Sequence, residues 1–224
     1  MRLLRNINWK DHFISFIVVI VGIYIAFKLN SYSEEASRQK ILQDHMEYIR
    51  DETVLNRINL EYIIADTDSL LKSIDLLIEH LRSDGDLAEI HRLTFDIISY
   101  QYVYLKKNAF STLTESGDIR YIKDYRLKTN TIRMYEYYNW TKVMEENAGS
   151  VLSEQYFPYL RKHMDLLNGD VQPRDVYFEK EYMNTIVSYR FSVSLMLEKY
   201  KDCLREVDGF LELLAENGFE VEEK

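Results

Sequence analysis

The order of apolar and polar residues divides the chain into one short apolar segment near its start and a long amphipathic remainder. The segment Phe13–Leu29 is apolar, and its first fifteen residues carry no charge. As a helix it spans about 25 Å, close to the lower limit for crossing a bilayer. The pattern predicts a transmembrane helix over residues 13–29, between a tail of residues 1–12 and a domain of residues 30–224.

Two other interpretations of this segment are a buried core helix and a cleaved signal peptide. A signal peptide ends in a small-residue cleavage pattern. The residues at the end of the segment, Ala26-Phe27-Lys28-Leu29-Asn30, contain no such pattern. We therefore expect an uncleaved membrane anchor.

A second long helix is predicted from Glu34 to Arg82, because apolar residues recur there in steps of three and four or their multiples. The positions expected to face the core are Ile41, Tyr48, Leu55, Ile58, Tyr62, Ala65, Ile74, Leu77 and Leu81. Only Asn30 to Ser33 separate this helix from the apolar segment. The pattern leaves open whether the two form one continuous rod.

The rest of the chain predicts further helices and no sustained strand alternation. The expected elements are a helix over 87–105, a short helix capped by Asn108 and ended by Ser116-Gly117, a turn at 119–123 capped by Asp118, a helix over 126–164 and a helix over 177–216. Pro158 should bend or interrupt its helix near Gln155. The predicted fold is all-α: a single transmembrane helix continuing into a long helix, with an exported antiparallel bundle of about four main helices.

Charge gives the anchor a direction. Arg2, Arg5 and Lys10 precede it, opposed by Asp11 alone, so the positive-inside rule leaves the N-terminus in the cytoplasm and exports the domain. Four of the 28 basic and one of the 37 acidic residues lie in residues 1–29, which leaves 24 basic against 36 acidic, a net charge of −12. Such a domain is unsuited to nucleic acid, whose phosphates it would repel.

Composition and motifs do not favour catalysis. Seven Gly and two Pro are few for this length and favour long helices, and the single cysteine, Cys203, cannot form an intrachain disulfide. The five histidines are scattered, the Glu-x-x-His pairs of di-iron bundles are missing, and no phosphate-binding or nucleophile motif occurs. The sequence predicts no catalytic residue, no cofactor and no metal site, and a protein that is not an enzyme.

Two sets of residues are candidates for contacts with other proteins. In the anchor, Ser15, Val19, Gly22 and Ala26 share a helix face, and Gly22 and Ala26 form a small-x-x-x-small pair that lets helices approach closely in lipid. The other set comes from an excess of tyrosine, which is enriched at interfaces but also fills polar bundle cores. Its members are Tyr100, Tyr102, Tyr104, Tyr135, Tyr137 and Tyr138, of which at least one in the first three should face solvent or a partner.

Two stretches together resemble a family of short bacterial single-pass membrane proteins of unknown function. The first is VVIVGIYIAFKLNS at 18–31, similar to the family's VIGI-x-IAL-x-[IL]-N anchor. The second is AFSTLTESGDIRYIKD at 109–124, similar to its AF-x-x-L-x-x-SG-x-[IL]-x-x-I-x-[DN] box. Lys28 stands where members often carry Gln, and a Ser-Tyr pair where many carry Trp. The resemblance implies an inner-membrane protein with a periplasmic helical domain and supplies no activity.

These observations favour a membrane-anchored interaction or scaffold protein, which associates with itself or with a protein partner in a membrane complex. The alternative is an extracytoplasmic ligand-sensing bundle that signals through a separate membrane partner. A channel is less favoured, because only Ser15 and Tyr24 could line a polar pore.

Overall fold

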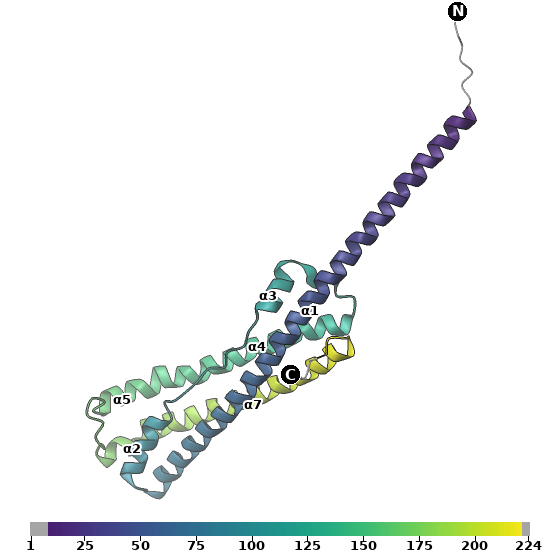
Figure 1. Ribbon diagram of the computed structural model, residues 1–224. Coiled ribbons are helices and arrows are strands. Elements are labelled where there is room, and N and C mark those ends of the chain that lie inside the picture. Colours follow the sequence, from purple (N-terminus) through teal and green to yellow (C-terminus); the bar gives the residue numbers. More distant parts are fainter. Residues whose placement is uncertain (1–8, 221–224) are drawn as a thin grey trace, which may run out of the picture.

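The computed structural model describes residues 9–220, which are helical apart from turns, the stretch 97–107 and a loop at 164–173 (Figure 1). The helices are α1 (Trp9–Ser83), α2 (Leu87–Asp96), α3 (Asn108–Glu115), the 3₁₀ turn η1 (Asp118–Tyr121), α4 (Tyr125–Val151), the π-helical turn η2 (Leu152–Tyr156), α5 (Phe157–His163), α6 (Arg174–Phe178) and α7 (Lys180–Glu216). The described part of the chain contains no strand, so the all-α prediction is confirmed. Arg2 and Arg5, on which the predicted orientation depends, lie outside the described residues.

Helix α1 answers the question that the sequence left open. It runs for 75 residues without a break, so the apolar segment and the next helix are one rod about 110 Å long. Its N-terminal part projects alone from the bundle (Figure 1), and none of its apolar window is buried. The segment is therefore not a core helix of this domain.

The bundle is built from four segments that alternate in direction (Figure 1). The second half of α1 leads away from the projecting end, and α2, the extended segment 97–107 and α3 return along it. Helices α4 and α5 lead away again, and α7 returns. The most extensive packing is of α7 against both α1 and α4. This agrees with the predicted antiparallel bundle of about four main helices. Its second member is divided into α2, the segment 97–107 and α3.

The predicted helix over 87–105 is wrong beyond Asp96. Residues 97–107 form no helix: after a turn at 97–98 the chain runs lengthwise along the bundle as a stretch that we call the extended segment (Figure 1). The stretch after Ser99 alternates tyrosine with other side chains, and aromatic and β-branched residues favour extended backbone. Side chains of α1 and α4 bond to four of its backbone groups, the N–H of Val103, the carbonyl of Tyr104 and both groups of Lys106, in place of a neighbouring strand.

Pro158 acts as predicted. It has no N–H, and its ring would clash with the carbonyl four residues earlier, at Glu154. The chain responds with the π-helical turn η2, which widens the helix just before α5 begins at Phe157. The expected interruption near Gln155 is confirmed.

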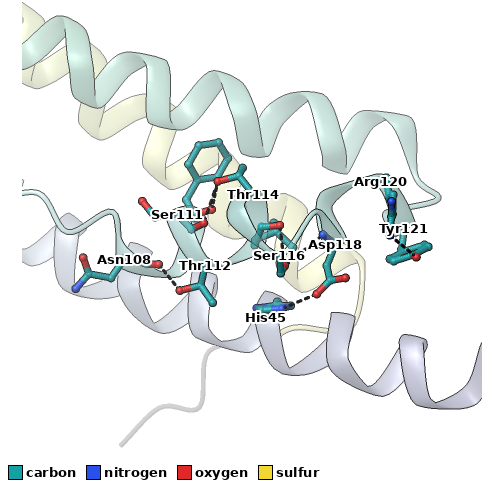
Figure 2. Close-up of polar contacts among 11 residues, drawn as sticks. His45, Asn108, Ser111, Thr112, Thr114, Ser116, Asp118, Arg120 and Tyr121 are labelled. Carbon is teal, nitrogen blue, oxygen red and sulfur yellow. Dashed lines mark hydrogen bonds and ion pairs between the residues drawn. The ribbon is translucent and has the colours of Figure 1, made fainter.

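The ends of the short helices follow the predicted turns with two corrections. Gly117 has φ 76° and stops α3, as the Ser116-Gly117 pair predicts, and Gly218 has φ 88° beyond α7. Asn108, however, is the first residue of α3 and not its cap. Asp118 caps nothing: its carboxylate lies 3.1 Å from Nε2 of His45 on α1 (Figure 2). That contact ties η1 to α1.

The buried side of α1 differs from the predicted one over its middle third. Ile74, Leu77 and Leu81 are buried as expected. The six expected core positions from 41 to 65 are exposed instead: Ile41, Tyr48, Leu55, Ile58, Tyr62 and Ala65. The side chains that do face the bundle over this stretch are Met46, Ile49, Glu52, Thr53, Asn56, Leu60 and Ile63. Four of these seven are apolar and three are polar. The buried side of α1 over this stretch is therefore less hydrophobic than the exposed side, and the sequence pattern favoured the wrong side.

Candidate interaction face and the buried polar contacts behind it

We call the exposed apolar residues Ile41, Tyr48, Leu55, Ile58 and Tyr62 the outer face of α1. Four of them follow one another in steps of seven residues, about two helical turns, so they form one strip along the helix. Tyr48 is 67% and Tyr62 61% exposed. Single exposed apolar residues are common, but a regular strip of large ones indicates a contact surface.

A groove of about 440 Å³ adjoins the outer face between α1 and α3. Tyr48 and Leu55 form one wall, and Ala109 and Thr112 of α3 lie opposite. Figure 2 shows α3 and η1 lying along α1 beside this region. The groove gives the flat strip a recess that could receive a side chain of a partner.

Acidic side chains accompany the outer face. Asp44 and Asp51 are exposed on the same side of α1. The guanidinium of Arg50 holds Asp51 with two hydrogen bonds of 2.9 and 2.8 Å to Oδ1. Asp51 is thus compensated within its own chain.

The four residues of the predicted anchor face lie on one side of α1. Ser15, Val19, Gly22 and Ala26 are all exposed, and nothing lies within 4 Å of a Cβ built on Gly22. The structure thus leaves this face open to another helix.

The first tyrosine group is partly exposed, on extended backbone and not on a helix. Tyr102 is 60% and Tyr104 68% exposed. Tyr100 is half-buried, and its hydroxyl donates to the backbone carbonyl of Glu145 at 3.0 Å. Tyr102 and Tyr104 remain candidates for contacts, whereas Tyr100 joins the extended segment to α4.

The second tyrosine group is mostly core, which corrects its assignment as a possible interface. Tyr135 is 3% and Tyr138 1% exposed. Tyr135 stacks on Phe110 with ring centroids 4.2 Å apart. Tyr137 is half-buried beneath the cations of Arg133 and Lys199. These rings hold α3, α4 and α7 together and offer little surface to a partner.

Two buried glutamates, which the sequence did not single out, fix the returning segment. Glu52 on α1 accepts hydrogen bonds from the Tyr135 hydroxyl at 2.6 Å and from the backbone N–H of Ala109 at 3.0 Å. Glu145 on α4 accepts from the Tyr200 hydroxyl at 2.5 Å and from the N–H of Val103 at 2.7 Å. Each carboxylate therefore joins a tyrosine to a backbone amide of the 97–115 region.

Asn56 and Asn59 complete this set of contacts from α1. Asn56 accepts from the N–H of Lys106 at 2.7 Å and donates to its carbonyl at 2.8 Å, as a neighbouring strand would. Asn59 donates to the carbonyl of Tyr104 at 2.8 Å. The signal in the sequence was the run of polar residues at helical spacing, Glu52, Asn56 and Asn59, on one side of a helix.

Burial raises the pKa of Glu145 above its ordinary value of 4.5, although the hydrogen bonds from Tyr200 and Val103 oppose the shift. Burial, and then the bond to Glu145, also raises the pKa of Tyr200, so that hydroxyl keeps its proton and donates. A carboxyl group with a raised pKa binds its proton more tightly in the folded state. Its contribution to stability is therefore complete below pH 4.5 and is lost as pH rises through the folded pKa.

We expect Glu145→Gln to remove this pH dependence. The difference in unfolding free energy, wild type minus Glu145→Gln, should fall as pH rises above about 4.5 and level off above the folded pKa. Urea unfolding of the full chain in detergent, followed by circular dichroism at several pH values, measures it. A difference that rises with pH would show that the carboxylate is stabilised and not penalised by its site.

Tyr189 and Tyr200 give a matched pair on α7, since both are fully buried. The hydroxyl of Tyr189 has no hydrogen-bond partner within the described residues. Tyr189→Phe should therefore be neutral or stabilising by up to about 1 kcal/mol, whereas Tyr200→Phe removes a donor from Glu145 and should cost about 1–3 kcal/mol. Urea unfolding compares the two, and equal losses would contradict the assigned contacts.

Residues 9–220 thus define an all-α chain with one helix long and apolar enough to cross a membrane. Among them, no group of three His, Cys, Asp or Glu side chains is arranged to hold a metal ion. Cys203 is buried, and burial raises the pKa of its thiol to about 12. No family model, no curated protein and no solved structure matches this chain.

Proposed function

We propose that this chain is a membrane-anchored interaction protein without catalytic activity of its own. Residues 13–29 span the bacterial inner membrane, the N-terminus stays in the cytoplasm, and the helical bundle stands on the periplasmic side. The outer face of α1 is the surface that receives a protein partner.

The observation that carries this proposal is the continuity of α1. One helix includes both the apolar segment and the outer face, so the bilayer sets the height of that face. At 1.5 Å per residue, Ile41 lies about 18 Å beyond Leu29, and Tyr62 about 50 Å beyond it. A rigid rod that presents an apolar strip at set heights suits a protein that aligns partners at a membrane.

Fractionation and topology mapping test the anchor. The full chain should remain in the membrane pellet after alkaline carbonate extraction, as an integral protein does. A periplasm-active reporter fused after Lys224 should be active, and a cytoplasm-active reporter at the same place should not. Recovery of the chain in the soluble fraction would overturn the anchor, and the opposite reporter pattern would overturn the orientation.

The sensing alternative stays a second candidate because of an open groove of about 640 Å³. It lies between α1, the loop after η1 and the turn after α7, with Gln39, Lys123 and Asn217 among its lining residues. Its volume is within the range of small-molecule sites. A screen of small polar metabolites by thermal shift tests it, since a ligand that binds the folded state raises the melting temperature.

A further inference from the structure

One unbroken line of exposed side chains, most of them small, joins the anchor to the outer face of α1. Its members follow one another in steps of three or four residues: Ser15, Val19, Gly22, Ala26, Asn30, Ser33, Ser37 and then Ile41. All of them are exposed. At about 100° per residue, the line and the outer face stay within a sector of roughly 100° from Ser15 to Tyr62.

The bundle leaves most of this sector open and adjoins only one edge of it, where α3 borders the groove and Asn59 bonds to Tyr104. The buried side of α1, represented by Ile49, Asn56 and Ile63, points roughly a third of a turn away from it. A second helix could therefore lie along α1 from the membrane to the height of Tyr62, beside α3 and with α4 and α7 on the other side of α1.

We propose that a second copy of this chain packs in parallel along this face, which extends the function proposed above by naming the partner. A bilayer inserts every copy in the same direction and at the same depth, so each position of one α1 meets the same position of the other. Small residues then meet small residues inside the membrane, where close backbone approach drives helix association. Outside it, apolar side chains at heptad spacing meet their equivalents.

The available area is of the size that a stable pair needs. From Ser15 to Tyr62 the face is about 70 Å long, and a helix presents a strip about 10 Å wide. That makes on the order of 700 Å² per copy, close to the ~800 Å² per partner of a standard protein interface.

Charge distinguishes a second copy from a basic partner. In a parallel pair Asp44 meets Asp44, and like charges repel, whereas Asp51 is compensated by its own Arg50. Asp44→Asn should therefore strengthen association between copies. A partner that carried Lys or Arg at this height would instead lose affinity with the same substitution.

Disulfide trapping in native membranes tests the pair. Replacing Cys203 by Ala leaves a background without cysteine, into which Ile41→Cys, Leu55→Cys or Gln39→Cys is introduced. Ile41 and Gln39 differ in height by only about 3 Å, but Gln39 points to nearly the opposite side of α1. Mild oxidation should give severalfold more covalent dimer with Ile41→Cys and Leu55→Cys than with Gln39→Cys, and Asp44→Asn should increase the yield further.

Each outcome decides a separate point. If the protein fractionates with membranes but Ile41→Cys yields no more dimer than Gln39→Cys, the pairing is wrong and the anchor stands. A yield that falls with Asp44→Asn contradicts the parallel register in which Asp44 meets Asp44, and overturns the pair proposed here. If the chain is not in membranes at all, the proposed function itself fails. Circular dichroism of each variant in detergent confirms that it is folded.

Discussion

Leu60→Asp is expected to unfold the bundle, whereas Leu55→Asp, five residues earlier on the same helix, is expected to leave it folded. Leu60 is fully buried and Leu55 is 44% exposed on the outer face. A carboxylate at position 60 would have no partner in an apolar site and would cost at least about 4–5 kcal/mol, comparable to the whole stability of a domain. At position 55 it stays in water and should change stability by about 0.5 kcal/mol or less.

Urea unfolding and far-ultraviolet circular dichroism of the full chain in detergent measure both variants. The pair tests which side of α1 is the core, the point at which the hydrophobic pattern and the structure disagree. If Leu55→Asp unfolds the bundle, Leu55 belongs to the core, as the hydrophobic pattern predicted, and the outer face is not a surface free for a partner.

Asn56→Ala is expected to have the second large effect, because it releases the extended segment. Asn56 is fully buried and makes both bonds to Lys106. Its loss leaves a backbone N–H and a carbonyl without partners in a site with little water, which should destabilise the fold by about 2–4 kcal/mol. Alanine at Asn59, whose bond to Tyr104 is exposed, is the matched control and should cost about 0.5–1 kcal/mol.

Amide hydrogen exchange gives the local readout for this pair. The N–H of Lys106 should exchange much faster in Asn56→Ala, and that of Val103, held by Glu145, should follow to a smaller extent. Unchanged protection of Lys106 would mean that the side chain of Asn56 does not hold the segment.

The parts of the fold that the sequence predicted correctly depend on neighbours in the chain. The apolar run from Phe13 is recognisable by its length alone. Gly117 can adopt a backbone conformation that most residues avoid, and Pro158 cannot continue a helix without adjustment. Each of these follows from a residue and the few that surround it, so no knowledge of the folded chain is needed.

The candidate interaction face was visible in the sequence but was given the wrong role. Ile41, Tyr48 and Leu55 formed the more regular apolar strip of α1, and the pattern assigned them to the core. The side that is buried carries Glu52 and Asn56, whose polar groups look suited to solvent until their partners are known. Those partners, Tyr135, Ala109 and Lys106, are 50 to 83 positions away in the chain.

Local patterns in the chain were enough to show that this protein is helical, that Gly117 and Pro158 end or interrupt helices, and that one segment has the length and polarity of a membrane span. The buried side of α1 and the path of residues 97–107 depend instead on contacts between distant parts of the chain. The physical reason is that helix periodicity and turn preferences act over a few residues. The burial of a carboxylate such as Glu52 or Glu145 becomes tolerable only when distant donors are brought to it.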